Sequence, residues 1–368
     1  MSEAGERGAG EGRGEGGGSG GRARESTGGE PPPPRRRWPL AAGPGSWAAW
    51  AAPLALAAGV AALPLLQPGA ETLRVLFVTL VWTTASVAWN LLGGFGGQVS
   101  FGFAVFYGLG AYTAALAINQ GAGPLVALAA AAAVASLVSV LIGLPTFRLR
   151  GPYFAIATIG VSEAVRVVMS NLAATGGASG YRIVERGPFR QLEHYYGALA
   201  LAVLAVAVSI LVRRSRLGLA LVAIREDEEA AADLGVDPFR AKLAVHALAA
   251  ALTGAAGGLH ARYAAFIHPQ GEFSFATSVA ILLMPIIGGV GTIWGPVLGA
   301  VVYGVVQEEV VASFPRLHLL VYGLLLMLIM LFQPAGVLGL WDLVRRGPRS
   351  RRRQRPGRPR RAPEAAGG

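Results

Sequence analysis

Ten apolar stretches follow one another between residues 47 and 339 of the sequence. An α-helix needs about 20 mostly apolar residues to cross the hydrocarbon core of a bilayer. The stretches lie at 47–67, 73–93, 99–118, 123–145, 153–171, 196–212, 243–261, 276–290, 293–310 and 318–339. The eighth and ninth are short and are joined through GGVG, so we expect eight to ten crossings. The sequence therefore predicts an all-α polytopic membrane protein.

Composition supports this class and divides the chain into three parts. Only 14% of the residues are charged, whereas an average soluble domain has about a quarter. The net charge is +11, but ten arginines follow residue 344, so the excess belongs to a tail and not to a nucleic-acid-binding fold. We expect a disordered tail at 1–46, a transmembrane domain at 47–340 and a disordered Arg-rich tail at 341–368 that lies against membrane lipids.

The distribution of arginine predicts the orientation. With the N-terminus in the cytoplasm, the dense arginine clusters all fall on the cytoplasmic side, as the positive-inside rule requires. The cytoplasmic segments are then 35–37, 93–98, 148–151, 213–242, 289–292 and the tail from 345. Both termini are cytoplasmic in this arrangement. The loops at 172–195 and 262–275 face outward, where an external partner would contact them.

The charged interval 213–242 is predicted to hold a short helix on the cytoplasmic side. Leu221, Ile224, Ala231 and Leu234 recur at helical spacing, which places them on one face of an amphipathic helix over 217–234. Gly235 follows the last periodic residue and Pro238 comes soon after, as is usual at a helix end. Such a helix would dock on a soluble partner, although a solvated connector between two spans has a similar composition.

Polar residues in the apolar runs are candidates for a translocation pathway. Charged and polar groups are expensive in hydrocarbon, so they pair with one another or face a wet interior. The candidates are Asn90, Gln98, Ser100, Tyr107, Tyr112 and Glu163. Hydrogen bonding between helices would explain them equally well, and Arg166 stands at the right spacing to pair with Glu163.

Glycines gather at two places in the apolar runs. Glycine permits close helix packing and also irregular backbone at a cavity. The residues predicted to pack or break helices are Gly96, Gly97, Gly102, Gly288, Gly289, Gly291, Gly295 and Pro296.

The sequence lacks the motifs of several enzyme classes. It contains no cysteine, no P-loop, no HExxH and no GxSxG. The five histidines have no convincing metal-ligand spacing. We therefore expect no catalytic residues, no metal site and no cofactor bound by this chain, and we expect no nucleic-acid partner.

Four motifs resemble one family. WNLLGGFGGQVSFGFAVFYGLGAYT, RLRGPYFAIATIGVSEAVR, EAAxxxG and LLMPIIGGVGTIWGPVLGA resemble, in this order, motifs of LivM-type permeases of ABC importers for branched-chain amino acids. Phe95 stands where that family usually has Tyr, and Thr292 where it usually has Ser. The resemblance covers roughly residues 73–340.

The resemblance implies a function and a set of partners. The chain would be a permease of the bacterial cytoplasmic membrane that works by alternating access on branched-chain amino acids or small amides such as urea. Its partners would be a LivH-type second permease, an extracytoplasmic binding protein and two cytoplasmic ATPase subunits, which would use ATP and Mg²⁺. The ATPases would contact Arg225, Glu229, Ala230, Ala231 and Gly235. The alternative is a secondary transporter or channel driven by an ion gradient.

Overall fold

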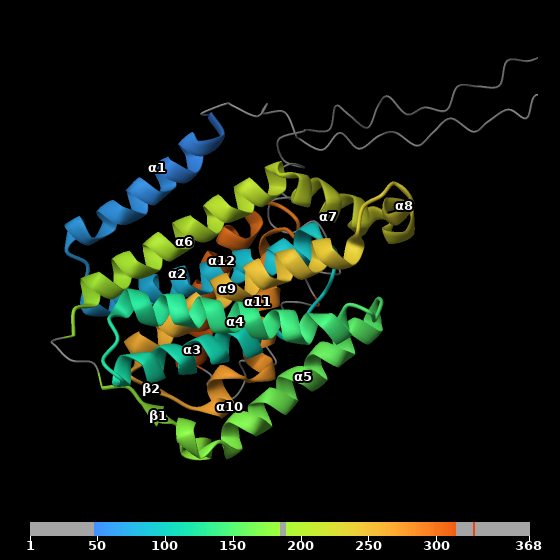
Figure 1. The fold of residues 1–368 in the computed structure, drawn as a ribbon. Helices are drawn as coiled ribbons and strands as arrows, with labels where there is room; N and C mark the ends of the chain where they lie inside the picture. The colour runs from blue at the N-terminus through green and yellow to red at the C-terminus, as the bar shows by residue number, and fades with distance from the viewer. Residues whose placement is uncertain (1–47, 185–188, 314–326, 328–368) are drawn as a thin grey trace, which may run out of the picture. The chain divides into compact units, whose positions relative to one another are not determined.

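Helices make up almost the whole described chain (Figure 1). The structure is a computed structural model that describes residues 48–184 and 189–313 and Met327. Its first half contains α1 (Ala48–Ala62), η1 (Leu63–Leu66), α2 (Ala70–Asn90), the π-helix η2 (Leu91–Phe95), α3 (Phe103–Asn119), α4 (Pro124–Thr146), α5 (Pro152–Asn171), η3 (Ala173–Thr175), η4 (Gly177–Ser179) and β1 (Tyr181–Arg182). The second half contains α6 (Gln191–Arg214), α7 (Arg216–Glu226), α8 (Glu228–Asp233), α9 (Pro238–Ala264), β2 (Phe266–Ile267), α10 (Pro269–Glu272), α11 (Phe275–Gly288) and α12 (Gly295–Ser313).

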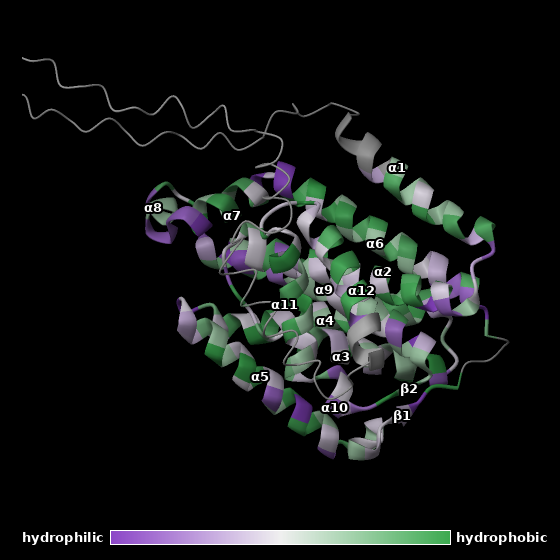
Figure 2. Cartoon of the chain, turned by 180° about the vertical axis from the view of Figure 1, so that it is seen from behind, coloured by the Kyte–Doolittle hydropathy of each residue, from purple (hydrophilic) through white to green (hydrophobic). Residues whose placement is uncertain are grey.

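The predicted membrane class is confirmed. Within the described residues, six helical stretches are long and apolar enough to cross a bilayer, namely Ala70–Phe95, α4, α5, α6, α9 and Pro269–Gly288. Three shorter apolar helices lie at Ala55–Leu66, Phe103–Asn119 and Gly295–Gln307. The predicted run at 318–339 (apart from Met327), the Arg35–Arg37 cluster and both predicted tails lie outside the described residues. Figure 2 shows hydrophobic residues along the helices and hydrophilic residues gathered at α8.

Helix α9 forms the centre of the bundle and packs against α2, α3 and α4. Small residues permit this contact. A Cβ atom added to Gly110 of α3 would lie 2.0 Å from the carbonyl oxygen of Gly254 in α9. One added to Gly257 would lie 2.0 Å from the carbonyl oxygen of Tyr107. The two backbones therefore touch, and dispersion contacts hold the helices together without a hydrophobic driving force.

The two predicted outer loops meet at one end of the bundle. Strands β1 and β2 pair antiparallel, with Tyr181 opposite Ile267 and Arg182 opposite Phe266. Asn119, at the end of α3, donates from Nδ2 to the carbonyl oxygen of Arg182 at 2.9 Å. The small sheet was not anticipated from the sequence, because each strand has only two residues. It joins the segments 172–195 and 262–275, which the arginine distribution places on the same outer side.

Candidate coupling site

The predicted single helix over 217–234 is wrong, because the segment folds into two helices. Helix α7 ends at Glu226, and Asp227 takes an extended backbone conformation. The Oδ1 atom of Asp227 accepts hydrogen bonds from the backbone N–H groups of Glu229 and Ala230, both at 3.0 Å. An N-cap of this kind starts a new helix, so α8 begins at Glu228. The acidic run around Asp227 is therefore split between two helices and does not follow a single helical axis.

The break also changes which residues are buried. Leu221, Ile224 and Ala231 are buried, as predicted. Leu234 is 85% exposed, so its predicted place on the buried face is wrong. The change of direction at Asp227 ends the periodicity on which that prediction depended, and Leu234 is already the C-cap of α8.

The end of α8 follows the prediction. Gly235 has φ +85° and donates its N–H to the carbonyl oxygen of Ala232 at 2.9 Å. The N–H of Val236 bonds the carbonyl oxygen of Ala231 at 3.1 Å, and the Val236 side chain packs against the hydrophobic cluster that contains Ala231. This is a Schellman motif, which requires a left-handed residue at the position of Gly235. Pro238 then opens α9.

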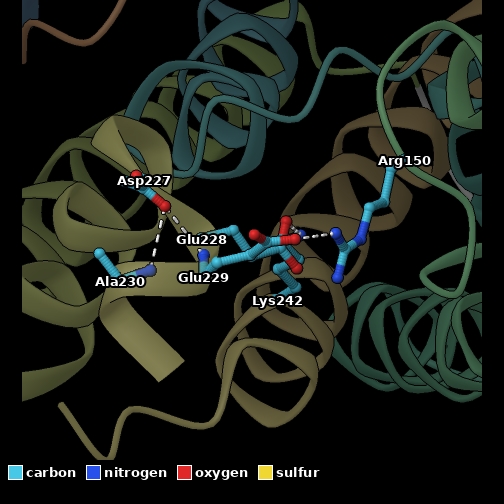
Figure 3. A network of polar contacts seen from close by, with 6 residues as sticks. All are labelled: Arg150, Asp227, Glu228, Glu229, Ala230 and Lys242. Carbon is cyan, nitrogen blue, oxygen red and sulfur yellow. Dashed lines mark hydrogen bonds and ion pairs between the residues drawn. The ribbon is translucent and has the colours of Figure 1, made fainter. Parts of the chain in front are cut away.

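Two ion pairs hold α8 in place (Figure 3). Glu228 pairs with Lys242 of α9 at 2.6 Å, and the Lys242 side chain is only 2% exposed. Glu229 pairs with Arg150 of the α4–α5 loop at 2.7 Å, with both side chains largely exposed. The hydrogen bond to Glu229 raises the pKa of Arg150. The exposed Glu229–Arg150 pair contributes little to stability. The buried ammonium group of Lys242 needs the carboxylate of Glu228 to balance its charge.

Two arginines connect the 213–242 segment to two glycine-rich interruptions of the helices, one at η2 and one between α11 and α12. Arg225 of α7 donates from Nη1 to the carbonyl oxygen of Gly94 in η2 at 3.0 Å. Arg213, near the end of α6, donates from Nη1 to the carbonyl oxygen of Gly291 at 2.5 Å. Gly291 lies between α11 and α12. We call Arg213, Arg225, Asn90, Gly94 and Gly291 the arginine junction.

Asn90 of α2 completes the arginine junction with two hydrogen bonds to the α11–α12 connection. This fully buried residue accepts a hydrogen bond on Oδ1 from the N–H of Gly291 at 2.9 Å. It donates from Nδ2 to the carbonyl oxygen of Thr292 at 2.8 Å. A Cβ atom on Gly94 would lie 2.7 Å from the nitrogen of Gly291, so the two breaks are in backbone contact. Asn90, predicted as a pathway residue, therefore fastens the α11–α12 connection to α2.

The remaining predicted glycines lie at close contacts. An added Cβ atom would come within 3.3 Å of a neighbouring atom at Gly96, Gly97, Gly102, Gly288, Gly291 and Gly295. Gly289 has φ +126°. The carbonyl oxygen of Pro296 accepts a hydrogen bond from Ser86 at 3.1 Å, which joins α12 to α2.

The other predicted pathway residues contact different elements. Ser100 is buried and its Oγ accepts from the N–H of Gly102, while Gln98 is partly exposed. Tyr107 is buried and stacks on Trp82. Tyr112 is buried against Phe273, and its hydroxyl has no hydrogen-bond partner among the described residues. Glu163 lies on the exposed side of α5 and pairs with Arg166.

A small pocket lies beside Ser100 and contains a residue that sequence reasoning missed. Its lining includes Ser100, Thr146, Thr158 and His246. The His246 ring is surrounded edge-on by Phe103, Phe106 and Phe147. A single histidine in an apolar run has no partner at a recognisable spacing, so no signal along the chain pointed to it. Within the described part of the chain, no group of three or more His, Asp or Glu side chains is placed to hold a metal.

Arg213, Glu228 and Lys242 were also missed. Lys242 is the one lysine in the chain, which could have drawn attention to it. The partner of each residue comes from another element, so spacing along the chain contains no signal for the pairs.

Membrane-length helices, two glycine breaks in contact and a polar helix pair linked to them define a polytopic membrane protein. Residues 71–330 match the family model described as "Branched-chain amino acid transport system / permease component". This match covers more than half of the sequence, and the chain belongs to that family.

Curated relatives support the assignment. The chain is 32% identical over 298 residues to the "High-affinity branched-chain amino acid transport system permease protein LivM" of Escherichia coli (strain K12), covering 73% of this chain and 70% of the relative. It is 30% identical over 135 residues to the LivH permease protein of Salmonella typhimurium, covering 36% and 43%. A probable LivM protein of Methanocaldococcus jannaschii is 26% identical over 228 residues, covering 56% and 66%. No solved structure matches the chain significantly.

Proposed function

We propose that the chain is one of two permease subunits of an ATP-driven importer that carries branched-chain amino acids across the bacterial cytoplasmic membrane. Membership of the permease family supports this function. The LivM and LivH relatives are both named as permease proteins of high-affinity branched-chain amino acid transport, which supports a pair of permeases. ATP hydrolysis then takes place on two separate ATPase chains, and an extracytoplasmic binding protein delivers the substrate.

The ATPase docks on the outer surface of α7 and α8. Glu229, Ala230 and Leu234 are exposed there, and Leu219 of α7 is 64% exposed. Exposed leucines on a polar helix pair are typical of a protein contact. Ala231 is buried and Arg225 bonds Gly94, so these two act from inside the segment and not by touching the ATPase. Gly235 shapes the turn that presents Leu234.

The arginine junction passes movement of the docked segment to the bundle. A displacement of α7 pulls Arg225 and, through it, the carbonyl group of Gly94 in η2. Arg213 and Asn90 connect the same movement to Gly291. Broken helices change direction at lower cost than continuous ones, because their backbone hydrogen bonds are already interrupted. The observation that supports this mechanism is the direct bonding of two arginines of the 213–242 segment to two glycine breaks.

The end of the bundle that carries α8 faces the cytoplasm. Four segments predicted on sequence grounds to be cytoplasmic, 93–98, 148–151, 213–242 and 289–292, are joined by the Arg150–Glu229, Arg225–Gly94 and Arg213–Gly291 contacts. Their common location supports the positive-inside assignment. The β1–β2 sheet then lies outside, where the binding protein docks.

Reconstitution of the complete complex tests this function. Proteoliposomes that contain both permeases, the ATPases and the binding protein should import leucine only with internal ATP, and isoleucine and valine should compete where urea does not. Leu234→Arg should abolish ATPase co-purification, because it places a charge in the apolar contact. Phe266→Ser, an exposed position at the opposite end, should leave co-purification intact. Import driven by a proton or sodium gradient without ATP would contradict the proposal.

A further inference from the structure

Helix α5 packs against the bundle along one narrow stripe. Phe154, Thr158 and Ser162 are buried at four-residue steps. The helix contacts α3, α4, α10 and α11. Thr158 accepts a hydrogen bond from the N–H of Phe101 at 3.1 Å. Much of the remaining helix circumference is exposed in this chain.

The exposed side carries two charges near the middle of the span. Glu163 lies eleven residues after the first residue of α5, in a helix of 20 residues that is about 30 Å long. It forms an ion pair with Arg166, with 58% and 28% of the two side chains exposed. Even a paired charge costs free energy in hydrocarbon, and residues of this kind face protein or water. Lipid is therefore a poor neighbour for this side of α5.

Helix α4 provides the comparison within the same chain. Its membrane-spanning part is buried to the same extent as that of α5, at 22% of residues. Its exposed residues from Leu125 to Leu144 are all aliphatic, namely Leu125, Val126, Ala129, Ala133, Leu137, Leu141 and Leu144. This is the composition of a lipid-facing helix. The two helices are equally exposed, but only α5 carries charges.

The exposed side of α5 also offers room for close approach. A Cβ atom added to Gly160 would meet nothing within 4 Å. Ala164, one turn later, is exposed as well. Two small residues four positions apart let another helix pack with its backbone close by. They lie beside Glu163 on the same face.

We propose that this face of α5 is the surface on which the second permease subunit packs. The α5 surface consists of Ile156, Gly160, Glu163, Ala164 and Val167. A helix of the partner lies over Gly160 and Ala164 and presents a polar group to the Glu163–Arg166 pair. The inference rests on the proposed two-permease function and adds which helix of this chain forms the contact. The charges disfavour lipid on this side of α5, and the small residues accommodate a helix.

Cross-linking in the complete complex tests the α5 surface. The chain has no cysteine, so Gly160→Cys gives this chain a single attachment point for benzophenone maleimide. Ala133→Cys, an exposed mid-helix position of α4, is the matched control. Photolysis should join position 160 to the second permease and should leave position 133 without a protein adduct. An adduct of position 160 with lipid alone, or between two copies of this chain, would overturn the proposal.

A second pair of variants tests the surface without cross-linking. Gly160→Leu should lower co-purification of the second permease at least tenfold, because the side chain fills the space for the partner helix. Ala133→Leu should leave co-purification unchanged. Equal recovery of the partner with both variants would refute the α5 surface. The proposed function fails separately if the unmodified complex does not assemble or does not import amino acids with ATP.

Discussion

Arg225 and Gly94 are 131 positions apart in the sequence, yet a guanidinium nitrogen of Arg225 lies 3.0 Å from the carbonyl oxygen of Gly94. The contact joins the short helices at one end of the bundle to the π-helix η2, which ends the membrane-length stretch Ala70–Phe95. The last carbonyl groups of a helix have no partner within the helix and are free to bond elsewhere. Arg225 uses one of them, so the position of α7 and the geometry of the break are not independent.

Replacement of Arg225 should separate ATP hydrolysis from transport. Arg225→Ala removes a hydrogen bond from a charged donor, of a kind worth about 1.5–3 kcal/mol, and should lower leucine uptake about tenfold or more. ATP hydrolysis should continue, because the docking surface is unchanged. Arg225→Lys should restore part of the uptake. Uptake and hydrolysis would be measured on the same proteoliposomes.

Arg240→Ala is the control for this prediction, since it removes one positive charge from the same region. Arg240 is exposed, and its guanidinium group pairs with nearby Asp237 at 3.0 Å. An exposed pair within one turn contributes little, so its loss should change neither uptake nor hydrolysis. If Arg225→Ala reduced ATP hydrolysis and leucine uptake by the same factor, the proposed role of Arg225 in passing movement of α7 to η2 would be wrong.

Replacement of Asn90 should loosen the α11–α12 connection. Asn90→Leu leaves the N–H of Gly291 and the carbonyl oxygen of Thr292 without their partner in a buried place. Each unsatisfied group costs about 1–3 kcal/mol, so the midpoint of thermal unfolding in detergent should fall by several degrees. Asn90→Asp keeps an acceptor for the N–H of Gly291, but as a carboxylate it has no donor for the carbonyl oxygen of Thr292, so the midpoint should fall with this variant as well. A midpoint unchanged by Asn90→Leu would contradict the role of Asn90 in fastening the α11–α12 connection to α2.

Replacements of Glu228 and Lys242 should have non-additive effects on the free energy of unfolding, because each charge balances the other. Glu228→Gln leaves the ammonium of Lys242 buried without a counter-charge and should destabilise the protein by about 2–3 kcal/mol. Glu228→Gln combined with Lys242→Met should recover much of that loss, because an apolar side chain of similar length fills the site. Denaturant unfolding of the four proteins of this cycle measures the coupling. Additive effects would show that the two residues do not interact.

Gly235 should tolerate asparagine better than alanine. The position has φ +85°, and an added Cβ atom would meet nothing within 4 Å, so the cost is backbone strain alone. A left-handed conformation costs an ordinary residue about 1–2 kcal/mol, and asparagine less. Gly235→Ala should therefore lower ATPase recovery more than Gly235→Asn does. Equal recovery with both would mean that the turn does not shape the docking surface.

The sequence predicted local features well where the physical cause is local. Apolar runs of membrane length indicated the spans, and Gly235 with Pro238 indicated the end of α8. Glu163 and Arg166 are three residues apart on one helix, so their pairing was predictable. The prediction of a single helix over 217–234 was wrong. Aspartate favours N-cap positions over helix interiors, so Asp227 starts a new helix although the apolar spacing continues past it.

The predicted pathway residues show the limit of the same reasoning. A polar residue in an apolar run must find a partner or water, and the sequence does not say which. The structure gives Asn90 two backbone partners at Gly291 and Thr292, and it leaves Glu163 on an exposed helix face. These are different roles for two residues that looked equivalent.

The sequence by itself determined the class of protein, its family motifs and the location of a charged segment between two spans. Hydropathy and helical periodicity are properties of short stretches, so a single chain displays them without folding. Tertiary structure decided that Arg213 and Arg225 meet Gly291 and Gly94, that Lys242 is buried on Glu228, and that one side of α5 is exposed among the residues that the structure describes. Those facts depend on which helices pack together, and packing is set by contacts between residues far apart in the chain.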